Sequence, residues 1–493
     1  MPSIPSLARV LAAAAVLGGS LPLPAQVAES EYASRRAALA AALGDGAFVA
    51  FGAGEPAHDY ERFEQTPNFQ YLTGIREPGA ALVMLGRGGR TAATLFVEER
   101  DPEREVWSGR RTGVAETARR TGLPARPARE LGRVLDSLAG AGVALRVAGE
   151  QGSEGVRSRD EQRLDLLRRR RPALRASNVS GAVEQLRGRK SAAEMALIRR
   201  AVEITVAAQR EAMALIEPDV NEFEAQAIIE YTFRRNGADR ASFATIVGSG
   251  PNSTTLHYNA DDRFMRAGEV VVMDIGASYR GYAADVTRTV PVSGTFTPEQ
   301  REIYQLVRDA QASAERQARP GAAAALMSDS ASATLAAGLA RLGLIEGAEA
   351  TYDCDATGGR QCPQLGLYYM HGLGHGIGLE VHDPEQYYFT GRLDVGSAFT
   401  LEPGVYVRAD LLDILPKTPR NRALAGKIGA AVAKYRDTGV RIEDDYVVTA
   451  QGVEWISRAP REAAEVEAAM RAPFAGPAKR DAAMVDAYRR VTQ

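Results

Sequence analysis

Histidine is rare in this chain, and most of it lies in one glycine-rich segment. The 493 residues contain five histidines, and His371, His375 and His382 all fall within MHGLGHGIGLEVHDP, residues 370–384. His371 and His375 have the i, i+4 spacing of two metal ligands on a helix, but the alternating glycines disfavour a helix. Neither HExxH nor GxGxxG is present in the segment. We expect extended or looped backbone, with glycines that let other segments or a substrate approach closely.

Two aspartates in a predicted hairpin could share a metal ion. Asp274 and Asp285 lie equidistant from the Tyr279-Arg280 step of VVVMDIGASYRGYAADVTRTV, which has the pattern of two strands and a polar turn. If the turn is centred there, the two side chains face each other directly, about 4.5 to 5.5 Å apart at Cβ, where like charges are destabilising. A divalent cation would neutralise them, because hard oxygen ligands suit such ions.

Two glutamates weaken the alternative that each aspartate is only a turn or strand-end residue. Glu402 in FTLEPG and Glu443 in VRIEDD each end a β-rich run, and Arg441 is the only obvious cation near them. Four acids on apolar strands, together with the clustered histidines, therefore predict one shared metal site. His257, in GPNSTTLHYNAD, indicates little alone, and His58 is expected to be structural.

Three helices with recognisable starts are expected to position these strands. Ser191 and Glu194 form a capping box before apolar residues that recur at helical spacing until Pro218. A second helix is expected over residues 221–236, and a third from Thr297, with proline at its first helical position. From about residue 29 to residue 185, apolar runs such as AFVAFG and AALVMLG alternate with helical stretches, which predicts a separate α/β domain.

The composition is that of an ordinary globular protein of two to four domains. Apolar residues make up 45% of the chain and the formal net charge is −2. The strongest arginine run, RLDLLRRRRPALR, is better explained as a solvated helix face than as a phosphate-binding patch, so no nucleic-acid partner is expected.

The N-terminus has the pattern of a secretory signal peptide. Residues 1–28 carry one positive charge, an apolar run and then small residues. Because the apolar run is shorter than the roughly 20 residues of a membrane span, we expect a periplasmic or secreted protein without a membrane anchor. Cys354 and Cys362 would then form one small disulfide loop, with two unconnected thiols as the alternative.

Five residues in this order match a known constellation. Asp274 in MDIGA, Asp285 in ADVTRT, His375 in HGLGHGIGLEVHD, Glu402 in TLEPG and Glu443 in RIEDD resemble the dinuclear metal site of the pita-bread metallopeptidases, family M24, and most of all that of aminopeptidase P. The resemblance covers nearly the whole mature chain. It implies an α/β (α+β) fold, with an aminopeptidase P N-terminal domain over 29–185, a pita-bread catalytic domain over 186–460 and a helical tail over 461–493.

The resemblance also implies a mechanism. Asp285 and Glu443 would bridge two divalent ions, Asp274 would chelate one, and His375 with Glu402 would complete the other. Manganese is the expected metal, with cobalt or zinc also compatible with such ligands. A hydroxide held between the ions would attack the scissile carbonyl, with Glu402 as proton carrier.

Further positions match residues that surround the site in this family. His257, His371 and His382 match second-shell positions that contact substrate and transition-state oxygen. Arg441 matches an arginine that holds site carboxylates, and Tyr406 matches a tyrosine near the site. Trp107, in VEERDPEREVWSGRRTG, matches a tryptophan that can reach a neighbouring subunit's site, which implies a dimer or tetramer; core packing is the alternative for it.

The expected activity is that of an exported Xaa-Pro aminopeptidase acting on peptides with proline at the second position. Prolidase, which uses the same ligands on Xaa-Pro dipeptides, is the alternative enzyme. Methionine aminopeptidase is disfavoured by the extra N-terminal domain, and a non-catalytic binding protein by the complete ligand set. The segment 408–438 is longer than in compact relatives, and it would either cover the substrate channel or pack outside.

Overall fold

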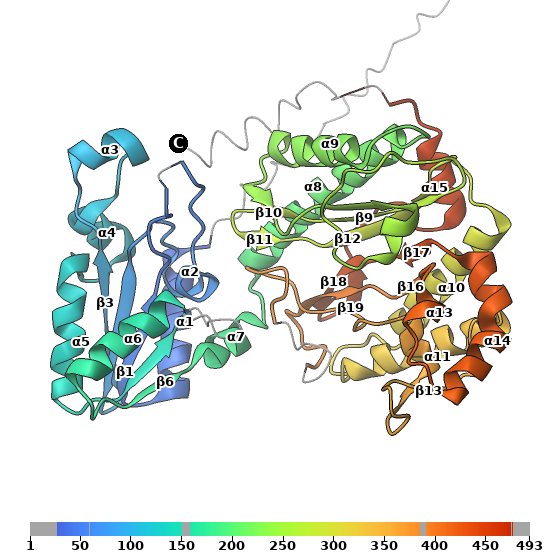
Figure 1. The fold of residues 1–493 in the computed structure, drawn as a ribbon. Helices are drawn as coiled ribbons and strands as arrows, with labels where there is room; N and C mark the ends of the chain where they lie inside the picture. The colour runs from blue at the N-terminus through green and yellow to red at the C-terminus, as the bar shows by residue number, and fades with distance from the viewer. Residues whose placement is uncertain (1–26, 59, 150–157, 385–390, 475, 477–493) are drawn as a thin grey trace, which may run out of the picture.

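A computed structural model describes residues 27–58, 60–149, 158–384, 391–474 and 476. The expected signal peptide therefore lies almost wholly outside the described residues, as does most of the expected C-terminal tail. The described chain forms two domains, the first coloured blue to teal and the second green to red in Figure 1. Among the described residues, none of the helices is both long enough and apolar enough to cross a bilayer.

The N-terminal domain is a mixed six-stranded sheet with helices on both faces. The strand order is β4-β3-β2-β1-β5-β6, and β1 pairs antiparallel with β2 and parallel with β5. Alternate residues of β1 face two different apolar cores, Phe48 one of them and Val49 the other, so the strand is apolar throughout. The elements are β1 Gly46–Phe51, β2 Ala81–Arg87, β3 Arg90–Val97, β4 Ala125–Pro127, β5 Leu145–Ala148, β6 Ala176–Asn178, α1 Glu29–Leu43, α2 Pro67–Thr73, α3 Pro102–Ser108, α4 Gly113–Thr121, α5 Leu131–Gly140, α6 Arg159–Arg170 and α7 Ser180–Arg187.

The three predicted helices open the second domain as expected. α8 Ala192–Leu215 starts at Ser191 with both hydrogen bonds of the capping box. α9 Glu222–Arg235 starts at Asn221, whose side chain accepts from an amide of the first turn. α10 Pro298–Glu315 starts at Thr297 with proline in the first turn.

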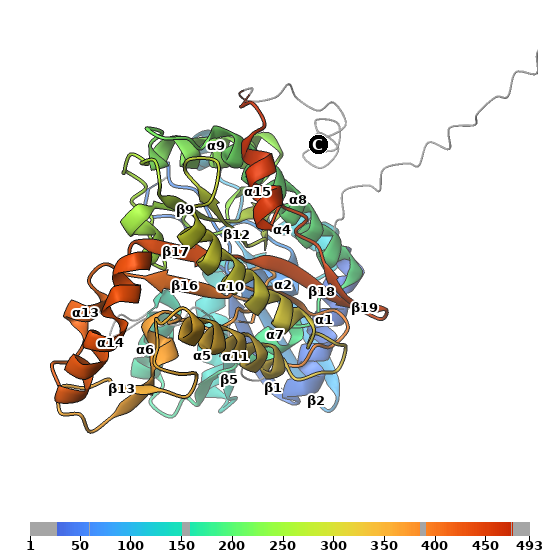
Figure 2. The same cartoon turned by 90° about the vertical axis from the view of Figure 1, so that its right-hand side faces the viewer.

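Short antiparallel sheets lie between two helical layers in this domain. α8 contacts β10, β11 and β12, while α10 contacts β16 and β17 from the other side. α10 packs beside α11 and crosses in front of β16 and β17 (Figure 2). The strands are β7 Arg240–Ala241, β8 Ile246–Ser249, β9 Val270–Ile275, β10 Ala277–Tyr279, β11 Tyr282–Ala283, β12 Val286–Pro291, β13 Thr351–Asp353, β14 Gln361–Pro363, β15 Ala398–Leu401, β16 Gly404–Val407, β17 Thr438–Arg441, β18 Asp444–Thr449 and β19 Gly452–Trp455. The remaining helices are α11 Ala325–Arg341, α13 Leu411–Ile414, α14 Pro419–Tyr435 and α15 Ala463–Met470.

Buried and half-buried ion pairs join the two domains. Arg35 of α1 lies 3.1 Å from Glu194 of α8. Arg187, at the end of α7, donates to Asn68 of α2 at 2.8 Å and pairs with Asp383 of the histidine segment at 3.1 Å. The N-terminal domain is therefore anchored to the segment that carries three of the predicted site histidines, His371, His375 and His382.

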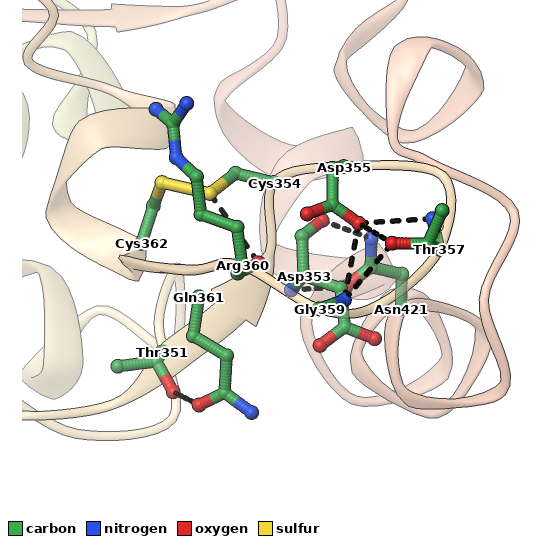
Figure 3. Close-up of a disulfide and its surroundings, with 10 residues drawn as sticks. All are labelled: Thr351, Asp353, Cys354, Asp355, Thr357, Gly359, Arg360, Gln361, Cys362 and Asn421. Atoms are coloured by element: carbon green, nitrogen blue, oxygen red, sulfur yellow. Dashed lines mark hydrogen bonds between the residues drawn. A yellow bond between two sulfur atoms is a disulfide. The ribbon is translucent and has the colours of Figure 1, made fainter.

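The disulfide prediction is confirmed, and it forms part of the packing of the long segment 408–438. Cys354 and Cys362 are bonded across the β13–β14 hairpin (Figure 3). Asn421 of α14 exchanges hydrogen bonds with the backbone of Asp353, and Thr418 donates to the Asp353 carboxylate at 2.6 Å. Since α14 also contacts α10, this segment packs on the outside of the domain against the disulfide hairpin.

Candidate active site

Asp274 and Asp285 lie on one hairpin, but the predicted register is wrong. Asp274 is opposite Thr287, and the tip is formed by Arg280 and Gly281, with φ of 52° and 89°. A two-residue turn with both φ angles positive favours glycine at its second position, which shifts the turn from the expected Tyr279-Arg280 step. In this register the two aspartates are diagonal neighbours on one face, still within reach of each other.

The directly opposed acids are instead Glu402 and Glu443. Leu401 of β15 pairs with Asp444 of β18. The pairing is interrupted over residues 402–403 and 442–443 and resumes where Gly404 of β16 pairs with Arg441 of β17. The common register places the two glutamates opposite each other, where the paired strands are interrupted. The repulsion that the sequence indicated for the aspartates therefore acts between these glutamates as well.

The histidine segment runs antiparallel beside β15. The Thr400 amide donates to the His375 carbonyl at 2.9 Å, and the Glu402 amide donates to the Leu373 carbonyl at 2.8 Å. The ring Nδ1 of His375 lies 3.1 Å from the Gly376 carbonyl, which makes it the donor nitrogen. Nε2 is left as a lone-pair ligand, 3.5 Å from oxygens of both Asp285 and Glu402 and 3.9 Å from Glu443.

The glycines of this segment allow it to fold back on itself, as expected. The Gly376 amide donates to the Pro384 carbonyl at 3.0 Å, and a Cβ at Gly376 would lie 2.6 Å from the Asp383 carbonyl oxygen. Lys190 donates to the same carbonyl at 2.5 Å, and Arg187 binds the Asp383 side chain. Any side chain at Gly376 would therefore displace the loop between His375 and His382.

Three buried carboxylate oxygens mark where a cation would bind. Asp274 Oδ1, Asp285 Oδ1 and Glu443 Oε1 have no hydrogen-bond partner within the described part of the chain. One ligand atom each of Asp285, His375 and Glu443 lie within 4.8 Å of one another. Unpaired buried acceptors are costly, so the residues present fit divalent ions bound by oxygen and one imidazole.

The pKa shifts of the site carboxylates have the same cause, which is the burial of several acids together. Burial raises the pKa of Asp285, and the Asp274 carboxylate raises it further. Burial and then Asp285 raise the pKa of Glu443. Burial raises the pKa of Glu402 to about 7, although His375 and Arg441 oppose the shift. Without a cation the site would therefore retain protons that a bound metal displaces.

A chain of hydrogen bonds links Asp274 to His371. Arg441 donates to Asp274 at 2.6 Å and to the Tyr406 hydroxyl at 2.7 Å. The Tyr406 hydroxyl lies 2.8 Å from Nε2 of His371, whose Nδ1 lies 2.8 Å from the Gly372 carbonyl. Both nitrogens of His371 thus have protein partners, although Nδ1 is also 3.7 Å from Glu402.

The other histidines differ in position. His382 has its ring centre 4.1 Å from that of His375, and burial together with His375 lowers its pKa to about 4. His257 follows Leu256, whose carbonyl accepts from Arg441 at 3.2 Å. His58 is exposed in the N-terminal domain, where it contacts Glu61 at 3.0 Å.

Two residues that support the ligands were not found from the sequence. The Thr287 hydroxyl donates to Glu443 at 2.7 Å, and Asp445 accepts from the Asp285 amide at 3.1 Å. Thr287 lies two residues after Asp285 and Asp445 two after Glu443, so strand alternation could have placed both on the ligand faces.

Trp107 is not a core residue. It lies near the end of α3 with 77% of its surface exposed, next to Val106 at 81%. The core-packing interpretation of this tryptophan is therefore wrong. The exposed pair leaves an apolar patch on the N-terminal domain.

Paired strands interrupted at their acids, a histidine segment beside them and a helical layer on each side are the arrangement that the resemblance to the pita-bread metallopeptidases implied. Residues 196–450 match the metallopeptidase family M24, and residues 32–144 match the aminopeptidase P N-terminal domain. The chain belongs to family M24, and within that family it is an aminopeptidase P.

Individual relatives agree over nearly the full length. The chain is 32% identical to the Xaa-Pro aminopeptidase of Escherichia coli K12, covering 90% of this chain and 98% of the relative. It is 33% identical to that of Haemophilus influenzae, covering 82% and 88%. Among solved structures, a substrate complex of E. coli aminopeptidase P superposes with a TM-score of 0.74 at 31% identity, covering 90% and 98%. A putative aminopeptidase P from Bacillus anthracis superposes with a TM-score of 0.77 at 28% identity, covering 90% and 99%. The predicted fold class and enzyme family are thus confirmed.

Proposed function

We propose that this enzyme hydrolyses the N-terminal Xaa-Pro bond of peptides, using two divalent ions held by Asp274, Asp285, His375, Glu402 and Glu443. Two observations carry the proposal. Buried oxygens of Asp274, Asp285 and Glu443 have no hydrogen-bond partner among the described residues, and ligand atoms of Asp285, His375 and Glu443 lie within 4.8 Å of one another. Relatives that align over most of the chain are named Xaa-Pro aminopeptidases. We further propose manganese as the metal, because carboxylate-rich ligand sets suit hard ions.

The bound ions would lower the pKa of a water molecule and polarise the scissile carbonyl. Glu402 is then suited to carry the proton from this water to the leaving proline nitrogen. Its side chain lies 3.5 Å from Nε2 of His375 and keeps 17% exposure, so it can reach both the metal site and solvent.

His257 and His382 would donate to the carbonyl oxygen as negative charge develops there. His382 is neutral at pH 7 because its pKa is low, so it can donate without competing as a cation with the metals. His371 would act differently, since both of its nitrogens have protein partners. It orients Tyr406, and through Tyr406 the guanidinium of Arg441.

A cavity between the domains offers space for the peptide. It has a volume of about 690 Å³ and is lined on the catalytic side by Leu379, Glu380 and Val381, which directly precede His382. Gln65 and Gln70 line it from the N-terminal domain. We place the part of the peptide outside the metal site in this cavity.

The test is an assay of manganese-loaded protein on Xaa-Pro dipeptides and on Xaa-Pro-Yaa tripeptides and longer peptides. Release of the first residue from the longer peptides is expected. Cleavage of dipeptides alone would mean that the enzyme is a prolidase. No hydrolysis of either substrate, with two bound ions confirmed by elemental analysis, would rule out both activities.

We propose that the protein is exported, since the signal pattern of residues 1–28 accompanies a disulfide, which persists in oxidising compartments. Fractionation of cells producing the full chain tests this, and retention in the cytoplasm would contradict it.

We also propose an oligomer that covers Val106 and Trp107, because exposed apolar patches mark interaction sites. Light scattering of Trp107→Ala beside the unchanged protein tests this, and an unchanged monomeric mass for both would contradict it.

A further inference from the structure

Glu222 is a buried carboxylate that no step of the proposed chemistry uses. It is the first residue of α9 and has no exposed surface. Its Oε1 accepts from the Ser249 amide and hydroxyl, both at 2.7 Å, and from Asn252 at 3.2 Å. Its Oε2 accepts from the Tyr258 hydroxyl at 3.0 Å and from the Arg263 amide at 2.9 Å. Hydrogen bonds to an ionised acceptor are about twice as strong as those between neutral groups, so Glu222 holds these donors firmly in place.

All of these donors belong to one segment, residues 249–263, and His257 lies between them. Ser249 and Asn252 precede His257, while Tyr258 and Arg263 follow it. Glu222 therefore holds the segment on both sides of this histidine, at backbone amides as well as at side chains. His257 itself is exposed, so its position depends on how the rest of the segment is held.

The middle of the same segment rests on the strand that carries Arg441. The Gly439 amide of β17 donates to the Ser253 hydroxyl at 2.9 Å, and Arg441 donates to the Leu256 carbonyl at 3.2 Å. A Cβ at Gly439 would lie 1.9 Å from the Ser253 carbonyl oxygen. The path of the segment thus sets the distance between His257 and β17, the strand that ends at Arg441.

The backbone next to His257 reaches the metal site. Arg441 donates to the Leu256 carbonyl at 3.2 Å and to the Asp274 carboxylate at 2.6 Å. His257 therefore follows directly on a residue that the arginine of the site holds.

We propose that Glu222 is a positioning residue for His257, whose carboxylate keeps segment 249–263 in the shape that presents this imidazole to the substrate. The inference rests on the proposed function, in which His257 donates to the scissile carbonyl. Glu222 acts only through His257, so its contribution to the reaction disappears once His257 is removed.

The experiment is a double-mutant cycle in the full-length, metal-loaded enzyme with an Xaa-Pro-Yaa peptide. Glu222→Gln removes the charge of the carboxylate. Tyr258→Phe removes one of the hydroxyl groups that donate to Glu222 and leaves Glu222 itself unchanged. We expect Glu222→Gln to lower kcat/KM about tenfold and Tyr258→Phe about threefold, mostly through kcat. In a His257→Ala background neither change should lower kcat/KM further.

Tyr435→Phe is the matched control. The Tyr435 hydroxyl also donates to a glutamate, Glu302, at 2.5 Å, but it lies at the end of α14. This variant should keep the kcat/KM of the unchanged enzyme, and metal content should be equal in all variants.

Three outcomes would overturn the proposal. Equal losses from Glu222→Gln or Tyr258→Phe with and without His257 would mean that Glu222 supports the fold generally, while the proposed function would stand. Full activity of both variants would also exclude a positioning role. Full activity of His257→Ala would instead remove His257 from the proposed mechanism, and the inference with it. If Glu222→Gln does not fold, the Tyr258→Phe cycle alone decides.

Discussion

Arg441 Nη2 lies 2.6 Å from Asp274 Oδ2, and both side chains are buried beside three other site carboxylates. The guanidinium neutralises one oxygen of Asp274 and leaves Oδ1 without a hydrogen-bond partner among the described residues. One carboxylate can therefore serve an arginine and a metal ion together. The arginine reduces the negative charge of the site without occupying the ligand oxygen.

Arg441→Gln should be strongly destabilising. Removing one member of a buried pair leaves the other charge uncompensated, which typically costs about 3 to 5 kcal/mol. Chemical denaturation of the metal-free proteins measures this loss. Arg441→Lys keeps the charge but lacks the planar guanidinium that also binds Tyr406. The stability of this variant should therefore lie between that of Arg441→Gln and that of the unchanged protein. Equal stability of the glutamine variant and the unchanged protein would contradict the prediction.

Asp285→Asn should abolish metal binding and activity together. The same change should stabilise the metal-free protein by about 1 kcal/mol or more at neutral pH. Burial beside Asp274 raises the pKa of Asp285, so the folded state must hold a proton that the unfolded state releases, and asparagine removes this cost. Elemental analysis, peptide hydrolysis and denaturation of the metal-free form give the three readings. Retained metal with retained activity would refute the role of Asp285 as a bridging ligand.

Chelation should lower the melting temperature of the unchanged protein, since bound ions stabilise only the folded state. At a free metal concentration of about 100 times Kd the stabilisation is about 2.7 kcal/mol. Calorimetry before and after EDTA treatment, and again after manganese is restored, measures it. The Asp285→Asn variant is the control, because its melting temperature should not respond to EDTA.

Asp261 should make stability depend on pH. It is 1% exposed, and burial raises its pKa to about 7, with Glu222 adding to the shift. The folded state therefore holds a proton that the unfolded state has released. The stability that this proton contributes is complete below about pH 4 and is lost as the pH rises to about 7. We expect a loss of about 2 kcal/mol after allowing for solvent screening.

Asp261→Asn should remove this dependence. Asparagine keeps the acceptor for the Val247 amide, now 2.9 Å from Asp261 Oδ1, and tolerates the positive φ of 45° at this position. Urea denaturation between pH 4 and 8 compares the two proteins. The same decline in both would assign the pH dependence to other groups.

Cys354→Ser with Cys362→Ser should lower the free energy of unfolding by about 2 to 3 kcal/mol, the cost expected for opening a short disulfide loop. Because the hairpin binds α14 on the outside of the domain, metal content should not change. Denaturation and elemental analysis of the double variant test both points. Loss of metal on opening the disulfide would show that the hairpin supports the site directly.

Sequence patterns predicted the helices and strands better than the geometry between the strands. The caps at Ser191, Asn221 and Thr297 have local causes and were confirmed. The register of the Asp274 hairpin depends on which two residues take positive φ, and the Arg280-Gly281 pair does so. A shift of one residue in the turn changed directly opposed aspartates into diagonal ones.

Contacts between distant segments were out of reach of single-sequence reasoning. Glu402 and Glu443 lie on separate β-rich runs, and only the pairing of β15 with β18 shows that they are opposed. The anchor at Glu222 precedes His257 by 35 residues and gives no local signal except its place at the start of a helix. The exposure of Trp107 likewise depends on the absence of packing partners, which composition does not reveal.

The excursion between β16 and β17 has a consequence for how this enzyme could be re-engineered. Tyr406 and Arg441 lie on paired strands and share a hydrogen bond, yet α13 and α14 separate them along the chain. Since α14 is fastened to the disulfide hairpin and to α10 rather than to the site, chain continuity at this point does not hold the two residues together. Lys417, an exposed residue between α13 and α14, is thus a natural place for new chain ends in a circular permutant, or for an inserted reporter domain.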